Sequence, residues 1–313
     1  MKILGISGGS RDGANDCMCK EALLAAQEEG AEISFIRLND LELKHCTGCK
    51  ACVMSLFSGR GNRCVLKDDM DWLIDQMYDA DGILFSIPIF EKCAMGQFHT
   101  IMDRFGPRMG RSNLIVAQDI AEKTNGKPID PRFLTDKCVS YMAIGGSDWT
   151  TQVQCDFALH ALTPMWKMID NEAFQWSLGI LAYDEKVARA HEIGKNLAKA
   201  AADIENASWQ GEEGVCPHCH SRNFFIKGKN TAVCGWCGIE GTLVTDGDTV
   251  KFEFPEEQLA HAHDTLSGQF IHADDIQKNE GTARQFTFTE DDKAKLKHYK
   301  ESVKAQKPEK AAK

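Results

Sequence analysis

Short apolar runs alternate with amphipathic stretches along the chain to about residue 205. The runs are bounded by turn-forming residues, as buried strands are, and the stretches between them repeat apolar residues at helical spacing. The predicted strands are residues 2–7, 32–38, 82–87, 138–145 and 176–182. The predicted helices are residues 15–30, 68–81, 95–105, 151–169 and 184–207. This alternation predicts a doubly wound α/β domain over residues 1–208, with a five-stranded parallel sheet covered on both faces.

Three segments depart from that alternation. Residues 106–137 are too long and too rich in Gly and Pro to be a simple connection. We therefore expect a loop that serves a site or an interface. Residues 213–254 read as a β-rich module with four cysteines, and residues 255–313 as a polar helical tail that is partly disordered.

Composition narrows the function classes. Of the 313 residues, 43% are hydrophobic and 26% are charged, as in soluble globular proteins, and the net charge of -10 argues against a nucleic-acid-binding surface. No stretch approaches the roughly 18 apolar residues of a membrane span, and the amino terminus does not resemble a signal peptide. We therefore expect a cytoplasmic protein without a membrane partner. In that compartment its 13 cysteines indicate metal or redox chemistry rather than disulfides.

The first strand-to-helix turn, "SGGSRDGAND" (7–16), has the composition of an anion-binding loop. Backbone N–H groups at the start of a helix attract an anion, and the helix dipole adds to this attraction. Ser7 and Ser10 offer hydroxyl groups, Arg11 a positive charge and Asn15 a side-chain donor. The G-x-G-x-x-G spacing of dinucleotide-binding folds is absent.

Two further loops open at the same edge of a sheet with strand order 2-1-3-4-5, where ligands of such folds bind. They are "PIFEKCAMGQF" (88–98) and "GGSDWTTQ" (145–152). Both contain residues that suit a flat ring. Pro88, Ile89 and Phe90 offer an apolar wall, and Trp149 a stacking surface. Gly145 and Gly146 permit close approach of the backbone.

These loops resemble those of the flavodoxin-like NADPH-dependent FMN reductase family, and within it the iron–sulfur flavoproteins. Gly8, Arg11 and Asn15 match the phosphate loop G-S-P-R-x-x-G-N-T, and the spacing from Pro88 to Asp103-Arg104 matches the family's spacing from P-V-Y to D-R. Asp16 stands where the family usually has a phosphate-binding Thr, and we expect a carboxylate there to repel a phosphate. The resemblance covers about residues 1–205.

The resemblance implies an FMN site, electrons from NAD(P)H or a reduced protein, a small organic acceptor, and a homodimer or homotetramer. Cys93 takes the place of a flavin-contacting residue that is often Ser. Glu91, His99, Tyr141 and Asp148 are candidates for a proton donor near the flavin, and no catalytic residue is assigned. The predicted flavin-binding residues are Ser7, Gly9, Ser10, Arg11, Asn15, Pro88, Ile89, Phe90, Glu91, Cys93, Gly145, Gly146, Asp148 and Trp149.

A first cysteine quartet, "CTGCKACVMSLFSGRGNRC", follows the second predicted strand. Three thiols at x2-x2 spacing with a fourth farther along suit a [4Fe–4S] cluster, in which each sulfur binds a different iron. The alternatives are plain thiols without a cluster, as in many relatives, or zinc, which this spacing suits less well. The residues are Cys46, Cys49, Cys52 and Cys64.

A second quartet has the spacing C-x2-C-x14-C-x2-C, typical of a zinc ribbon in which four sulfurs surround one ion. A module this small needs the metal to fold. Mononuclear iron of the rubredoxin type has the same ligands and would relay electrons. The ligands are Cys216, Cys219, Cys234 and Cys237.

Together these features predict an FMN-dependent oxidoreductase. Two alternatives remain: an electron-transfer protein without a small substrate, and a non-enzymatic regulator that binds a partner through the ribbon.

Overall fold

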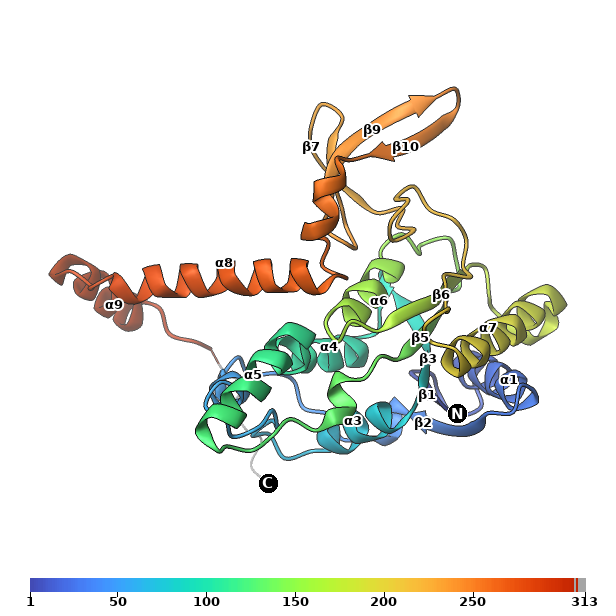
Figure 1. Cartoon of the computed structure of the whole chain (residues 1–313), viewed down its shortest axis with the longest axis horizontal. Coiled ribbons are helices and arrows are strands. Elements are labelled where there is room, and N and C mark those ends of the chain that lie inside the picture. The colour runs from blue at the N-terminus through green and yellow to red at the C-terminus, as the bar shows by residue number, and fades with distance from the viewer. Residues whose placement is uncertain (307, 309–313) are drawn as a thin grey trace. The chain divides into compact units, whose positions relative to one another are not determined.

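The computed structural model describes residues 1–306 and 308, and its largest element is a parallel sheet. The strands are β1 (Lys2–Ser7), β2 (Glu32–Arg37), β3 (Gly82–Phe90), β5 (Cys138–Ile144) and β6 (Lys167–Phe174). Their order is β2-β1-β3-β5-β6, and each neighbouring pair is parallel (Figure 1). The predicted 2-1-3-4-5 order and the flavodoxin-like fold class are confirmed.

Helices cover both faces of this sheet. On one face lie α1 (Ala14–Glu28) and α7 (Asp184–Ala202). On the other lie α3 (Met70–Asp79), α4 (Gly96–Met109) and α6 (Val153–Leu162) (Figure 1). The sheet is therefore buried on both sides, as near-continuous apolar strands require.

Alternate residues of the central strands serve the two cores. Ile83 and Phe85 pack with α3, α4 and α6, whereas Leu84 packs with α1 and α7. Helices α1 and α7 lie very close together. A Cβ atom added at Gly194 of α7 would lie 1.9 Å from the carbonyl oxygen of Ala22 in α1, so this position requires glycine.

The position predicted for the fifth strand, residues 176–182, is wrong. The strand is β6, and the predicted segment contains only the 3-10 helix η3 (Ile180–Ala182). Polar residues in the middle of β6 hide it from a hydrophobicity pattern. Asp170 is fully buried there. Its burial is tolerated because Arg189 of α7 donates a 2.5 Å hydrogen bond to its carboxylate.

The helix predicted over residues 151–169 is also too long. α6 ends at Leu162, and the next residues make the turn into β6. Pro164 lies in this turn, and the residue before a proline disfavours helical backbone.

Residues 106–137 are not the irregular loop that their Gly and Pro content predicts. They contain α5 (Arg111–Thr124) and the 3-10 helix η2 (Pro131–Leu134). Leu114, Ala117 and Ala121 are buried at helical spacing on one face of α5. Gly106, with φ of 33°, interrupts the helical backbone near the end of α4.

The cysteine module contains a separate antiparallel sheet in the order β10-β9-β8-β7. Its strands are β7 (Phe224–Gly228), β8 (Thr231–Cys234), β9 (Glu240–Asp246) and β10 (Thr249–Glu253). The β-rich character predicted for this region agrees with that arrangement.

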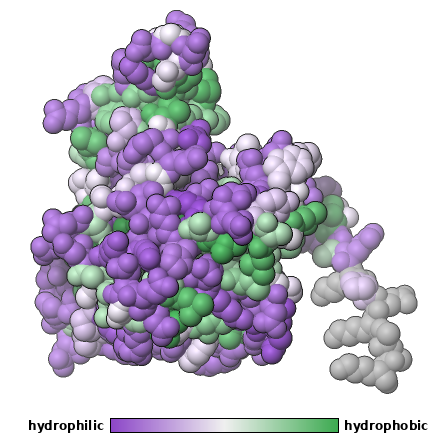
Figure 2. Space-filling model, turned by 90° about the vertical axis from the view of Figure 1, so that its right-hand side faces the viewer, coloured by the Kyte–Doolittle hydropathy of each residue, from purple (hydrophilic) through white to green (hydrophobic). Residues whose placement is uncertain are grey.

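The chain divides into two compact units, Met1–Phe270 and Ile271–Lys313, and the domain boundaries predicted near residues 208 and 254 stay a prediction. No helix among the described residues is long and apolar enough to span a membrane. The face in Figure 2 is mostly hydrophilic, with smaller hydrophobic patches between the hydrophilic residues. The remaining elements are η1 (Leu38–Asp40), α2 (Ala51–Leu56), β4 (Cys93–Ala94), η4 (Glu256–His261), α8 (Leu266–Gln285) and α9 (Glu290–Ser302).

His160 is a polar residue at the centre of the larger core. Its Nδ1 atom lies 2.9 Å from the hydroxyl of Tyr141, and its Nε2 atom is buried without a hydrogen-bond partner. Aromatic rings surround the imidazole, including Phe98 and Phe105 with centroids 5.2 and 4.8 Å away. Burial lowers the pKa of His160 to about 3.

This burial predicts a loss of stability in acid. The unfolded chain binds a proton at His160 below pH 6.5, whereas the folded chain does so only near pH 3, so stability falls as the pH drops through this window. At pH 5 the loss from this group is about 2 kcal/mol. We expect His160→Gln to unfold more easily at pH 7.5 but to lose less stability between pH 7.5 and 5.0, as measured by urea unfolding. The exposed His298→Gln is the control, and an unchanged pH dependence in His160→Gln would contradict the assignment.

Candidate functional site

The three loops predicted to bind a ligand meet at one edge of the sheet. β1, β3 and β5 are adjacent and parallel, so their carboxyl ends lie side by side. A Cβ atom at Gly8 would lie 2.3 Å from the sulfur of Met95 and 3.1 Å from Cδ of Pro88. A Cβ atom at Gly145 would lie 3.0 Å from Ile89. The predicted 88–98 loop therefore begins inside β3, and the last residues of β3, with Met95, contact the loops on both sides.

A buried carboxylate shapes the first loop. Asp16 is fully buried and accepts a 2.5 Å hydrogen bond from the Ser7 hydroxyl and a 3.0 Å bond from the backbone N–H of Asp12. The Ser7 hydroxyl in turn accepts a 3.2 Å bond from the backbone N–H of Gly9. Ser7 and Asp16 therefore fix the conformation of the loop from within.

Arg37 neutralises this carboxylate. Its Nε and Nη2 atoms donate bonds of 2.9 and 2.6 Å to Asp16, and its Nη1 atom donates a 2.7 Å bond to Asp40. Burial by itself would raise the pKa of Asp16, but the hydrogen bonds from Arg37 and Ser7 hold it below the usual value. The repulsion of a phosphate expected from Asp16 is thus offset by an adjacent positive charge.

Of the four predicted polar groups, two face solvent, and Ser7 and Asn15 do not. Ser10 and Arg11 are exposed, with the Arg11 guanidinium 3.6 Å from Asp40. Asn15 is buried, and its Oδ1 atom accepts a 3.3 Å bond from the hydroxyl of Ser86 in β3. A Cβ atom at Gly9 would lie 2.7 Å from Cβ of Asn15, so Asn15 lies against the loop backbone.

A tight hairpin follows β3. Phe90 pairs with Cys93 of β4, and the two residues between them, Glu91 and Lys92, have φ of 49° and 70°. Positive φ at both central positions is the geometry of a type I′ turn, and side chains other than Gly, Asn or Asp rarely adopt it. Residues with strained backbone conformations of this kind are often found at functional sites. Asp156 of α6 holds the hairpin by accepting a 2.8 Å bond from the backbone N–H of Ala94.

Three large aromatic side chains are uncovered at these loops. Phe90, Trp149 and Trp176 are each about three-fifths exposed (60%, 58% and 61%). Lys92 lies over the Trp149 ring with its Nζ atom 5.1 Å from the centroid. Ser147 joins the two tryptophans. Its hydroxyl oxygen accepts a 3.2 Å bond from the backbone N–H of Trp149, and its backbone carbonyl accepts a 3.5 Å bond from the backbone N–H of Trp176.

The proton-donor candidates differ in position. Tyr141 lies in the core with His160, and burial raises its pKa well above the usual value, so it is not available to a ligand. Glu91 and Asp148 are exposed at the loops, and Gly146 beside them is exposed too. His99 lies on α4 with its Nε2 atom 3.4 Å from Asp156.

The first cysteine quartet lies on a segment held by two buried arginines of α4, with Cys52 in the short helix α2 and the other three cysteines outside it. Arg104 forms an ion pair with Asp68 and donates a 3.1 Å bond to the carbonyl of Lys44. Arg108 donates to the carbonyl of Asn62 and to Asp71 at 3.2 and 3.3 Å. Cys46 and Cys49 are exposed, and Cys52 and Cys64 are half-buried. Within the described residues these sulfurs do not form a group tight enough for a single ion.

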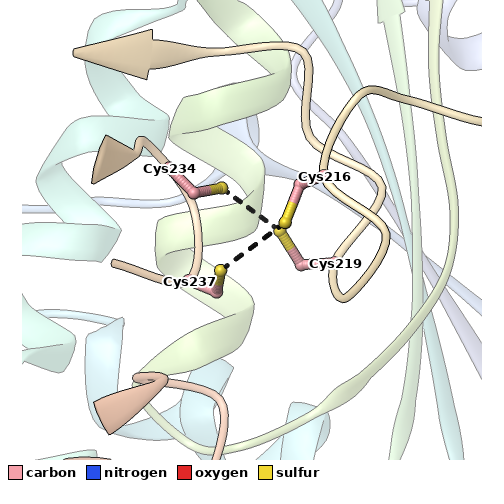
Figure 3. Close-up of side chains that lie close together, drawn as sticks. All are labelled: Cys216, Cys219, Cys234 and Cys237. Carbon is pink, nitrogen blue, oxygen red and sulfur yellow. Dashed lines mark hydrogen bonds between the residues drawn. The ribbon is translucent and has the colours of Figure 1, made fainter. Parts of the chain in front are cut away.

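The second quartet is gathered as a single-ion site. All four sulfur atoms lie within 4.8 Å of one another, and the distances are 3.9 Å for Cys216–Cys237 and 3.5 Å for Cys219–Cys234 (Figure 3). Zinc–sulfur bonds of about 2.3 Å in a tetrahedron place sulfurs about 3.8 Å apart, so the donor set fits such an ion.

The two knuckles of this centre share one geometry. The N–H of His220 bonds the carbonyl of Cys216 at 2.9 Å, and the N–H of Gly238 bonds that of Cys234 at 3.1 Å. The neighbouring imidazoles are engaged elsewhere, His218 with Asp264 at 2.9 Å and His220 with Glu213 at 2.8 Å. The four cysteines therefore supply the ligands without a histidine.

The loops at the switch point of this 2-1-3-4-5 sheet carry glycines, an exposed arginine and exposed aromatic rings, and flavodoxin-like folds bind their ligands at this edge. A family model described as NADPH-dependent FMN reductase matches residues 1–180, so the chain belongs to that family. It is an FMN oxidoreductase. The non-enzymatic alternative is therefore set aside.

Individual relatives extend this similarity. A solved structure described as a flavone reductase is 54% identical, covers 99% of this chain and 100% of its own, and superposes with a TM-score of 0.89. A flavone synthase of Aspergillus candidus is 26% identical over 292 residues, which is 89% of each chain. An iron–sulfur flavoprotein of Methanocaldococcus jannaschii is 38% identical over 108 residues, which is 34% of this chain and 53% of its own.

The exposed position of Arg11 generates a prediction. Arg11→Ala removes the uncovered cation of the first loop while leaving the buried Asp16–Arg37 pair intact. Because charge-assisted hydrogen bonds to a phosphate are strong, we expect FMN to bind at least about tenfold more weakly, with folding unchanged. Quenching of flavin fluorescence measures the affinity, and the exposed Arg222→Ala is the matched control. Full FMN occupancy in Arg11→Ala would show that the phosphate lies elsewhere.

Proposed function

We propose that this protein reduces the carbon–carbon double bond of flavone-type aromatic ketones, with NADPH or NADH as the electron source. The observation that carries the proposal is the 54% identity to a flavone reductase over 99% of the chain, cysteine module included. The net reaction joins a hydride from the nicotinamide and a proton from solvent to the two carbons of the enone. FMN, when bound, supplies the two-electron chemistry that links the two substrates.

The chain's own residues would bind and orient the reactants. Ser10 and Arg11 would hold the FMN phosphate at the start of α1, and Gly145 and Gly146 would admit the ring system close to the backbone. The exposed rings of Phe90, Trp149 and Trp176 are suited to stack on a planar aromatic acceptor and to exclude water from it.

The relative named a flavone synthase supports the same class of compound. Forming and reducing a flavone are opposite directions of chemistry at one double bond, so both names point to an acceptor of flavone type. An electron-transfer role without a small substrate has no comparable support across the whole chain.

The proposal is tested by anaerobic turnover. We expect FMN-loaded protein to oxidise NADPH or NADH when flavone is added and to yield a product heavier by two hydrogens, as detected by mass spectrometry. We expect Trp149→Ala to raise the KM for flavone about tenfold through lost stacking. With FMN kept saturating, NADPH oxidation with ferricyanide as the acceptor should change little in Trp149→Ala. Trp72→Ala, which replaces an exposed tryptophan on α3, is the control. Loaded protein that reduces ferricyanide but never flavone would contradict the substrate class.

For the metals we propose zinc at Cys216, Cys219, Cys234 and Cys237, and a [4Fe–4S] cluster at Cys46, Cys49, Cys52 and Cys64. Support for zinc comes from the spacing of the four gathered sulfurs. Support for the cluster comes from the x2-x2 spacing and from the similarity to iron–sulfur flavoproteins over about a third of the chain. A cluster spreads its ligand sulfurs more widely than one ion does, in keeping with the open first quartet.

Elemental analysis of anaerobically purified protein tests both metal assignments. We expect one zinc, four iron atoms and four labile sulfides per chain. Cys219→Ser should lower the zinc content alone, and Cys49→Ser should lower iron and sulfide alone. Iron without labile sulfide would favour a rubredoxin-type centre at the second quartet, and the absence of iron would leave the first quartet as plain thiols.

A further inference from the structure

The cysteine module packs on α6, the helix that follows the 145–152 loop. Ala158 of α6 is buried in one cluster with Cys216, Trp236 and Cys237. Cys155, one turn earlier on α6, donates its thiol hydrogen to the carbonyl of Gly235 at 3.6 Å. The knuckle of Cys234 and Cys237 therefore lies directly against α6.

Asn223 is the polar link between the two knuckles. Its backbone carbonyl accepts a 2.7 Å bond from Gly235, and its Oδ1 atom accepts a 3.3 Å bond from the indole N–H of Trp236. Its backbone N–H donates a 3.0 Å bond to the hydroxyl of Ser221, near the first knuckle. Gly235 and Trp236 lie between the cysteines Cys234 and Cys237 of the second knuckle. The position of Asn223 therefore depends on how that knuckle is folded.

The remaining group of Asn223 reaches the flavin loop. Its Nδ2 atom donates a 2.8 Å bond to the carbonyl of Thr151, which lies at the end of the 145–152 loop. The preceding Thr150 is buried and accepts a 2.9 Å bond from Gln175 after β6. The end of this loop is thus fixed from the sheet by one residue and from the metal module by another.

The same helix also reaches the second flavin loop. Asp156 of α6 bonds the backbone N–H of Ala94 in the β3–β4 hairpin, one residue along from the Cys155 that contacts the module. A displacement of α6 would therefore move the hairpin and the 145–152 loop together.

We propose that Asn223 is a positioning residue through which the metal-folded module holds the 145–152 loop in its FMN-binding conformation. The proposal rests on the flavin site described above. It makes metal binding and FMN binding mutually supportive, because two ligands that favour one conformation of a shared element raise each other's affinity by the same factor. The module is therefore part of the flavin site rather than an independent appendage.

The test uses full-length, metal-loaded protein. Asn223→Asp keeps the acceptor for Trp236 but replaces the donor to Thr151 with a carboxylate that faces a carbonyl oxygen. We expect FMN to bind about fivefold more weakly, since one net hydrogen bond is lost, with the zinc content unchanged. We also expect faster hydrogen exchange of the 145–152 amides in the FMN-free protein.

Asn230→Ala is the matched control, because its side chain bonds Leu243 within the module at 3.2 Å. Trp236→Phe removes the indole N–H and keeps a smaller aromatic ring, so a smaller weakening of the same sign is expected even if Asn223→Asp folds poorly. Unchanged FMN affinity and exchange in both variants would overturn the link while leaving the flavin site standing. Failure of the unmutated, metal-loaded protein to bind FMN would instead overturn the flavin site.

Discussion

The parallel pairing of β1, β3 and β5 is the constraint on which the site depends. Parallel neighbours end at the same edge, so loops that are far apart in sequence are brought together there. The contacts of Gly8 with Pro88 and of Gly145 with Ile89 show that the end of β3 touches the loops after β1 and β5. A one-residue slip of register would exchange the faces on which Leu84 and Phe85 are buried, so the two cores also fix the loops.

Buried charge gives the second level of order. Asp16 with Arg37 fixes the first loop, and Asp68 with Arg104 fixes the loop of the first cysteine quartet. Such pairs add little net stability over apolar packing, but each partner is costly to bury without the other. Their effect is geometric. With Asp16 already neutralised by Arg37, Arg11 is left as an exposed cation of the first loop.

The sequence pattern was sufficient where local signals agree with the tertiary structure. Four strands are apolar runs with turn residues at their ends, and the loops that follow them could be assigned to one edge. The fifth strand was misplaced because Asp170 is polar and yet buried, and its partner Arg189 lies on a later helix. The predicted strand at residues 176–182 also included Trp176, so the sequence pattern did not place this exposed ring beside the 145–152 loop.

Other parts of the site depend on relations that spacing does not reveal. Arg37 pairs in register with Ser7 across neighbouring strands, and this places its guanidinium beside Asp16. The Glu91–Lys92 turn lacks the Asn or Gly that usually marks a type I′ hairpin. Asn223 reaches Thr151 over 72 residues of sequence. Each of these residues would require the strand order and the module's position to be known first.

The two cysteine quartets differ in how far the surrounding fold depends on them. In the second, the sulfurs already lie at the spacing of one tetrahedral ion, and the knuckles form part of a small core with Trp236 and Ala158. A metal bound there would complete the packing that holds the module together. In the first, Arg104 and Arg108 hold the loop through Asp68 and Asn62, while Cys46 and Cys49 face solvent. Because side chains other than the thiols already order that loop, a cluster bound there would add redox chemistry rather than the fold itself.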